Sequence, residues 1–93
     1  MTAYVVVELT VQDHDAREKY SAGAGPTIKA FGGEFLVVGP WSVLTGDAAF
    51  TAGAIISFAD RETAMRWYNS PEYQALIPLR DAALQSRFRV LGA

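Results

Sequence analysis

The sequence contains no cysteine, and this absence excludes several kinds of chemistry. Without thiols the chain has no disulfide framework, no thiolate nucleophile, no iron–sulfur cluster and no thiolate zinc site. The single histidine, His14, is too few for a metal site built on several imidazoles. We therefore expect no metal and no cofactor.

The chain also has little excess charge and no long apolar run. Eight basic and ten acidic side chains leave a net charge of -2, which gives no electrostatic footprint for nucleic acid. No apolar stretch approaches the roughly 20 residues that cross a membrane, and the first residues lack the basic start of a signal peptide. We expect a cytoplasmic protein that binds neither nucleic acid nor membranes.

Apolar residues, in contrast, are abundant and make up 51% of the 93 residues. A chain of this length forms one domain, expected over residues 1–93, and keeps about a third of its unfolded-chain surface exposed. An apolar half is high for a chain that must also cover itself with polar groups. We expect either a face covered by a partner or an apolar pocket.

Runs of apolar and β-branched residues predict five strands. They cover residues 3–11, 34–38, 41–45, 53–59 and 87–91. In the first run the odd positions are all apolar, while the even positions include Glu8 and Thr10. Gly39–Pro40, between the second and third runs, is expected to form a turn.

Cap residues and helical spacing predict helices between these strands. The predicted helices cover residues 13–31, 61–68 and 71–85, with caps at Asp13, Asp60 and Ser70. Gly32–Gly33 is expected to end the first helix. A kink or a restart is expected at Pro26, and a kink is expected near Pro78. The order predicts an α+β, ferredoxin-like β-α-β-β-α-β fold, with an antiparallel sheet and helices on one face.

The strands lack the polar alternation of a sheet that is covered on one side only. Phe35 and Val37 share one face of their strand, and Leu36 and Val38 share the other. Helices can cover one face, and the same face of a second subunit, related by a twofold axis, can cover the other. We expect a homodimer through the helix-free sheet face; the alternative is a monomer with an exposed apolar face.

Glu8 is an unusual charge on the expected dimer face. Glu8 lies on the same face of its strand as Tyr4 and Val6, so a face-to-face dimer would partly bury it. We expect an ion pair with Arg87 or Arg89 at the interface; a catalytic carboxylate is the alternative.

Arg80 is the one charge on the apolar stripe of the last predicted helix. It follows Tyr73 by seven residues and lies only about 20° from it around the helix. Such a guanidinium pairs with a buried acid, extends to solvent or points into a cavity, where it would bind an anion or an enolate.

Aromatic side chains gather on the same expected helical face. Trp67, Tyr68 and Tyr73 surround the break between the last two helices, and Tyr20 lies on the buried stripe of the first. Aromatic residues at helical spacing are commonly core residues, but buried tyrosine hydroxyls need partners. Together with Arg80 they predict an apolar cavity with a few polar groups, which is the usual composition of a small-molecule site.

The segment Trp67–Gln74, read as WYNSPEYQ and followed by Arg80, resembles the family numbered 1330 among the domains of unknown function. The resemblance extends over nearly the whole chain, through Tyr4, Tyr20, Pro26, the Ala30–Gly33 turn, Gly46 and Phe58. It implies a dimeric α+β barrel made of two ferredoxin-like subunits. Where the family commonly has Arg-Gly-Gly, this chain has Val38–Gly39–Pro40, which weakens an inference of an anionic substrate.

The wider superfamily contains cofactor-independent monooxygenases, lactone isomerases, haem-degrading enzymes and stress-response proteins. We expect either a cofactor-independent enzyme acting on a small hydrophobic, enolisable or phenolic metabolite, or a non-catalytic small-molecule-binding or stress-response protein. The candidate catalytic residues are Arg80, Tyr20 and Tyr68, and the candidate substrate-binding residues are Trp67, Tyr73, Ser70 and Phe58. No well-placed general base is evident.

Overall fold

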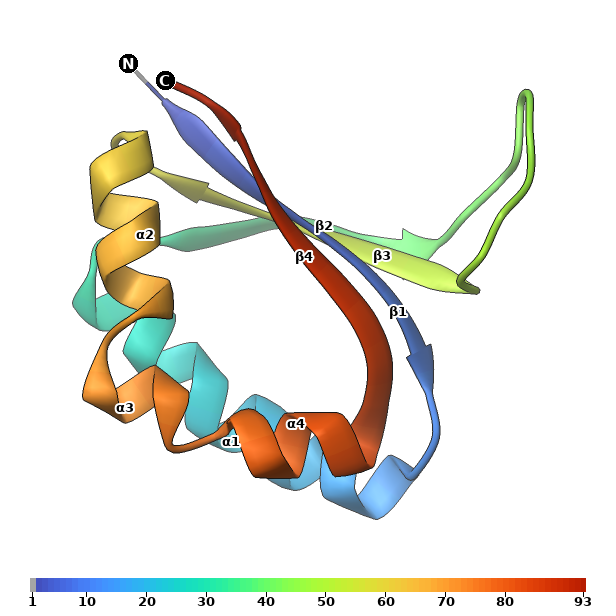
Figure 1. Cartoon of the computed structure of the whole chain (residues 1–93), viewed down its shortest axis with the longest axis horizontal. Helices are drawn as coiled ribbons and strands as arrows, with labels where there is room; N and C mark the ends of the chain where they lie inside the picture. Colours follow the sequence, from blue (N-terminus) through green and yellow to red (C-terminus); the bar gives the residue numbers. More distant parts are fainter. Residues whose placement is uncertain (1) are drawn as a thin grey trace.

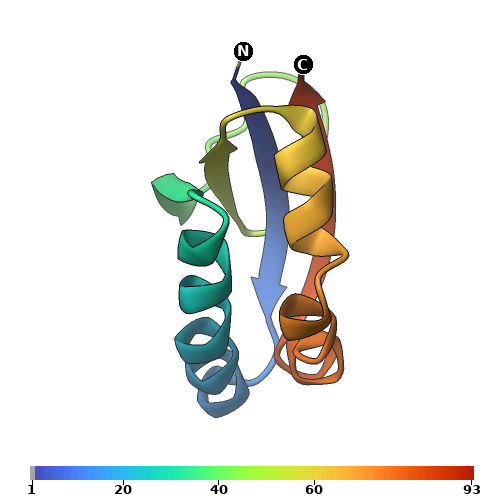
Figure 2. The same ribbon diagram turned by 90° about the vertical axis from the view of Figure 1, so that its left-hand side faces the viewer.

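The computed structural model describes residues 2–93 and consists of one sheet with helices on one of its faces (Figure 1). The strands are β1 (Ala3–Val11), β2 (Glu34–Pro40), β3 (Ala52–Phe58) and β4 (Leu84–Gly92). The helices are α1 (His14–Ala30), α2 (Arg61–Tyr68), α3 (Pro71–Gln74) and α4 (Ile77–Ala83). Figure 2 shows the helices in front of the sheet. The predicted ferredoxin-like α+β fold is confirmed.

The sheet is antiparallel throughout, in the order β2-β3-β1-β4. In the central strand β1, Ala3, Val5 and Val7 are buried toward the helices. The alternate residues lie on the helix-free face because successive side chains of a strand point to opposite sides. The alternating side chains of β1 therefore form two faces: one lies in the core under the helices, and the other is the helix-free face of the sheet.

Side-chain caps fix where three of the helices begin, as the sequence predicts. The carboxylate of Asp13 accepts from the Ala16 amide at 3.0 Å, and that of Asp60 accepts from Thr63 at 2.7 Å. The Ser70 hydroxyl accepts from the Tyr73 amide at 3.3 Å. Each cap satisfies an amide that has no partner inside its helix.

The expected restart at Pro26 is not found, because α1 continues through this residue. Pro26 is exposed, whereas Tyr20, Ala24 and Ile28 are buried. Packing of this buried stripe outweighs the one hydrogen bond that proline removes. Gly32, with φ +71°, then ends the helix in a conformation that favours glycine.

The expected strand over residues 41–45 is also wrong: this segment is part of the loop between β2 and β3. β2 continues through Gly39 and Pro40, which pair with β3, so the expected turn at these two residues is wrong and the chain does not reverse to place residues 41–45 beside β2. The loop rises on the side opposite the helices (Figure 1). Leu44 in the loop is 98% exposed, while Trp41 packs on Gly53.

The last predicted helix is shorter and more divided than expected. It forms α3 and α4, with Pro78 in the first turn of α4, because proline has no N–H to continue a regular helix from α3. β4 begins at Leu84, opposite Val11, so Gln85 belongs to the sheet. No helix in the described part of the chain is long and apolar enough to cross a membrane.

Candidate functional site

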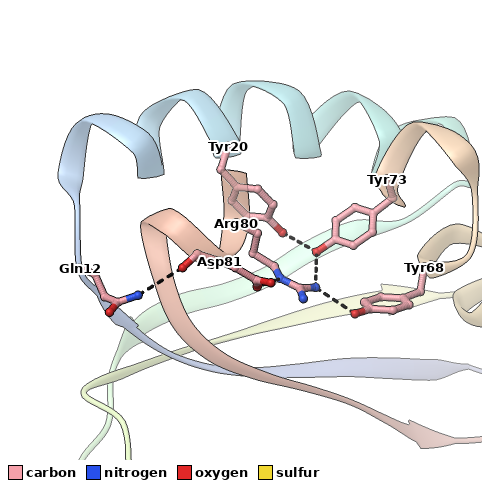
Figure 3. A network of polar contacts seen from close by, with 6 residues as sticks. All are labelled: Gln12, Tyr20, Tyr68, Tyr73, Arg80 and Asp81. Atoms are coloured by element: carbon pink, nitrogen blue, oxygen red, sulfur yellow. Dashed lines mark hydrogen bonds and ion pairs between the residues drawn. The ribbon is translucent and has the colours of Figure 1, made fainter. Parts of the chain in front are cut away.

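Three tyrosines and one arginine meet between the helices and the sheet, each supplied by a different helix (Figure 3). The hydroxyl oxygens of Tyr20 (α1) and Tyr73 (α3) lie 2.7 Å apart and are hydrogen-bonded. Nη1 of Arg80 (α4) donates to the Tyr68 hydroxyl (α2) at 2.9 Å and to the Tyr73 hydroxyl at 3.3 Å. We call these four residues the tyrosine–arginine cluster.

Ser70 sets the geometry of the short link between Tyr68 and Tyr73. Its hydroxyl donates to the Trp67 carbonyl at 2.7 Å and accepts from the Tyr73 amide. Gln74 donates to the Tyr68 carbonyl at 2.6 Å. These local bonds end α2, start α3 and direct both tyrosines toward Arg80.

The Arg80 guanidinium is enclosed rather than extended into solvent. Its side chain is 12% exposed, and the guanidinium carbon lies 4.9 Å from the centre of the Phe88 ring. Nε donates to the exposed carboxylate of Asp81 at 3.2 Å. None of the three predicted possibilities is found as stated, because Asp81 is 63% exposed and is not a buried acid, the guanidinium is enclosed, and Arg80 lines neither of the spaces described below.

Burial affects the protonation of two of the tyrosines in the cluster. It raises the pKa of the Tyr20 hydroxyl above its ordinary value, and it does the same for Tyr73. Burial alone would lower the pKa of Arg80, but its hydrogen bonds to Tyr68 and Tyr73 raise it overall. Tyr20 and Tyr73 are therefore neutral hydroxyls beside a permanent cation.

The direction of the hydrogen bonds determines which proton is available to a ligand. Arg80 has only donors, so the Tyr73 oxygen accepts from it. When Tyr73 donates in turn to Tyr20, the Tyr20 hydrogen is left for a third group. Charge-assisted bonds are stronger than neutral ones, and chains of hydrogen bonds polarise one another.

A cavity of about 200 Å³ lies between α1 and the sheet. Its lining is mostly apolar and consists of Val7, Leu9, Arg17, Tyr20, Ser21, Ala24, Ile28, Phe35, Val38, Ala54, Ile56, Trp67, Leu84 and Phe88. We call it the α1–sheet cavity. Two of the predicted site residues, Tyr20 and Trp67, line this cavity. The other members of the tyrosine–arginine cluster, Tyr68, Tyr73 and Arg80, do not line it.

A second cleft, of about 350 Å³, lies on the other side of Trp67, between α2 and the sheet. Tyr68, Met65, Arg61 and Arg89 are among its lining residues. The Trp67 indole is fully buried and donates to the Thr27 hydroxyl at 3.1 Å. Because Trp67 lines both spaces, it stands between the α1–sheet cavity and this cleft.

The remaining predicted residues lie outside both spaces. Phe58 is fully buried, with its ring centre 5.4 Å from that of Trp67, and Ser70 is the cap of α3. His14 is exposed. Sequence reasoning missed Arg17, although its position three residues before Tyr20 places both on neighbouring parts of one helical face.

Val38 also lines the cavity, from the edge strand β2. The expected pairing of Phe35 with Val37 on one face is wrong, because a bulge between these two residues shifts the register and puts Phe35 and Val38 on the helix side. This is where the sequence departs from the Arg-Gly-Gly pattern of the family it resembles. The wall contributed by β2 is therefore apolar at this position, since Phe35 is the other β2 residue in the lining.

Comparison with known proteins supplies a family and several fold relatives. A family model with the description Domain of unknown function (DUF1330) matches residues 2–93. A search of curated proteins finds no match.

Three solved structures illustrate the fold relatives. RPA0582, a protein of unknown function from Rhodopseudomonas palustris, has a TM-score of 0.80 and 17% identity, covering 99% of this chain and 82% of that chain. SnoaB, a cofactor-independent oxygenase from Streptomyces nogalater, has a TM-score of 0.71 and 16% identity, covering 99% and 92%. A dimeric ferredoxin-like protein of unknown function from Jannaschia sp. CCS1 has a TM-score of 0.67 and 15% identity, covering 100% of both chains. Identities this low show a common fold alone.

Proposed function

The chain belongs to the DUF1330 family, and we propose that it binds a small, mostly apolar metabolite in the α1–sheet cavity. We propose further that it acts on this metabolite as a cofactor-independent enzyme, at an enolisable carbonyl or a phenol. The supporting observation is the position of Tyr20. Its side chain lines the cavity, and its hydroxyl is hydrogen-bonded to Tyr73, which accepts from Arg80.

The size and lining of the cavity limit the ligand. A dry protein cavity of about 150 Å³ holds benzene, so a cavity of about 200 Å³ suits a ligand of one or two fused rings. Aromatic and aliphatic walls with few polar groups are usual in ligand pockets. The Tyr20 hydroxyl is then a natural partner for the ligand's carbonyl or phenol oxygen.

The chemical role of the cluster is to stabilise negative charge on that oxygen. An enolate or phenolate oxygen accepts a stronger hydrogen bond than the neutral ground state does, so Tyr20 favours the charged form. Arg80 strengthens this donor through Tyr73 at a fixed position and without reorganisation. Removing one such donor commonly costs about 10²–10³ in rate.

The described residues that line the cavity include no carboxylate and no imidazole. The substrate must therefore be acidic enough to release its proton to water. Reprotonation at a different carbon completes an isomerisation. In an oxygenation, an activated methylene R₂CH₂ reacts with O₂ to give R₂C=O and H₂O. The four electrons that reduce O₂ all come from the substrate, so no separate reductant is needed. The likeness to SnoaB, a cofactor-independent oxygenase, supports this class.

The two-ring ketone 2-tetralone provides a direct test, because its enolisation exchanges a C1 proton for deuterium in D₂O. We expect the protein to accelerate this exchange, measured by NMR against buffer alone. Tyr20→Phe is expected to lose most of the acceleration, whereas Tyr4→Phe, on the helix-free face, keeps it. Exchange at the buffer rate with the unaltered protein contradicts the enzymatic proposal.

The second candidate is a non-catalytic binding protein that uses the same cavity. The lack of a carboxylate or imidazole in the described lining favours it, because proton abstraction normally needs a positioned base. Binding of 2-tetralone without accelerated exchange identifies this case. Calorimetry and the exchange assay together therefore separate the two functions.

We also propose that two copies of the chain pair through the helix-free sheet face. The strand registers place four side chains in a row across this face: Val37, Ile55, Val6 and Arg89. Val37 is 54% exposed in the single chain. Glu8 on the same face is bonded to Arg87 at 3.4 Å and to Arg89, and this pairing reduces the cost of burying these charges.

Sedimentation tests this pairing. Val37→Glu adds a carboxylate to the proposed interface, so we expect it to convert a dimer into a folded monomer. Lys19→Glu makes a charge change on the exposed part of α1 and is expected to leave the dimer intact. A monomeric unaltered protein at micromolar concentration contradicts the proposal, as does a dimer that survives Val37→Glu.

A further inference from the structure

Arg17 is the one charged side chain among the described residues that line the α1–sheet cavity. We infer from it that the ligand carries an anionic group, a carboxylate or an equivalent, at the end of the cavity where Arg17 lies. This inference rests on the proposed function, because it assigns the ligand class of the same cavity.

The electrostatic setting of Arg17 supports an anion. Within residues 2–93 the ion pairs join Arg80 to Asp81, and Arg87 and Arg89 to Glu8, so none involves Arg17. The nearby acids on the same turns are Asp13, Asp15 and Glu18, and none lines the cavity. The Asp13 carboxylate is used as the cap of α1. A ligand anion would therefore meet a cation that has no competing carboxylate inside the cavity.

The order of residues along α1 gives the cavity a polarity. Arg17, Tyr20, Ser21, Ala24 and Ile28 all line it and follow helical spacing, so they form one continuous face. The polar members are at the start of this face and the apolar members are at its end. A ligand with one charged end and an apolar body matches this gradient, with the charge near Arg17 and the rings toward Ile28.

The spacing of Arg17 and Tyr20 also restricts where the charge is placed on the ligand. Residues three apart on a helix have their β-carbons roughly 5–6 Å apart. Both side chains therefore start from neighbouring positions on one wall of the cavity, so a single ligand of one or two rings can carry both the anionic group and the oxygen. Ser21, beside Tyr20, supplies a hydroxyl that can donate to the same anion.

Exposure sets the expected strength of the contact. Arg17 as a whole is exposed, so its charge lies at the mouth of the cavity and is partly screened by water. An exposed ion pair is worth little, whereas a guanidinium–carboxylate pair with hydrogen bonds is stronger. We expect about a fivefold to tenfold preference for an anionic ligand over its neutral counterpart.

A matched pair of probes tests the inference: 4-hydroxy-2-naphthoate and its methyl ester, which differ in charge but share the phenol and the rings. Dissociation constants are measured by calorimetry at low salt. We expect the unaltered protein to bind the carboxylate fivefold to tenfold more tightly than the ester. Arg17→Gln is expected to abolish this preference, because the affinity for the carboxylate falls to about that for the ester.

Lys19→Gln is the control, because it removes a cation from an exposed position of α1 outside the cavity. It is expected to keep the preference. Equal affinities in the unaltered protein, or a preference that survives Arg17→Gln, overturn the inference but leave the cavity as a binding site. A preference that Lys19→Gln weakens equally also overturns it, since the attraction is then due to overall charge. If neither probe binds the unaltered protein, the proposed function fails together with the inference.

Discussion

The hydroxyl oxygens of Tyr20 and Tyr73 lie 2.7 Å apart and join α1 to α3 in the interior of the protein. Their rings meet edge to face, with centres 6.4 Å apart. This contact links a residue that lines the α1–sheet cavity to one that accepts a hydrogen bond from Arg80. The pair therefore connects the stability of the helical layer with the chemistry proposed for the cavity.

Removing either hydroxyl is expected to destabilise the fold, by different amounts. Tyr20→Phe breaks one buried bond but leaves Tyr73 bonded to Arg80, so we expect a loss of about 1 kcal/mol. Tyr73→Phe leaves the Tyr20 hydroxyl and an Arg80 N–H without this partner, so we expect about 2 kcal/mol. Urea unfolding measures both. Tyr4→Phe is the control, and equal losses in the two test variants would contradict the linked arrangement.

Alkaline pH is expected to weaken the fold through the same two residues. Burial raises the pKa of Tyr20 and Tyr73 above the ordinary tyrosine value of about 10. The folded state then holds these protons more tightly than the unfolded state does. Their contribution is therefore complete below about pH 10 and is lost as the pH rises toward the folded-state values. Each group adds at most about 1.4 kcal/mol per pH unit to the slope.

The measurement for this prediction is the urea midpoint at a series of pH values from about 8 to 12. The variant that carries both Tyr20→Phe and Tyr73→Phe is expected to lose stability less steeply above about pH 10. The same slope in the variant and the unaltered protein would show that other groups control alkaline unfolding.

We expect the hydrogen bonds of Arg80 to contribute more to the stability of the fold than its ion pair does. Arg80→Met removes the donor to Tyr68 and Tyr73 and replaces a cation enclosed by Phe88. We expect a loss of about 2–3 kcal/mol, since hydrogen bonds to charged groups contribute more than neutral ones. Arg80→Lys keeps the charge without the planar fork and is expected to lose about half as much.

Asp81→Asn is the matched control for Arg80, because Asp81 is 63% exposed and its ion pair is near the surface. Exposed pairs contribute about 0–1 kcal/mol, so we expect little change in the urea midpoint. If Asp81→Asn lost as much stability as Arg80→Met, the ion pair rather than the hydrogen bonds would account for the contribution of Arg80.

Sequence patterns were sufficient to predict features that depend on residues close together in the chain. The caps at Asp13, Asp60 and Ser70 depend on neighbours three residues away, and all three are observed. Helical spacing also placed Tyr73 and Arg80 on one face. They do meet, although the helix between them is broken.

Sequence patterns were insufficient where distant segments decide the outcome. Residues 41–45 have strand-forming side chains, but a strand needs a neighbour, and β2 already occupies the edge of β3. The position of the cavity depends on how the side chains of α1 and the sheet fill the space between them. Helical spacing placed Arg17 and Tyr20 on one face of α1, but it could not show that Arg17 lines the cavity and that Arg80 does not.

The contact of Trp41 with Gly53 is expected to hold the start of the β2–β3 loop against the helix-free face. A β-carbon added at Gly53 would overlap the Trp41 ring, whereas one added at Gly39 would meet nothing within 4 Å. Gly53→Ala should therefore displace the indole into water, and Gly39→Ala should not. The test is iodide quenching of tryptophan fluorescence, which reports on Trp41 because Trp67 is fully buried. We expect stronger quenching in Gly53→Ala alone; equal quenching in both variants would show that the sheet does not position this side chain.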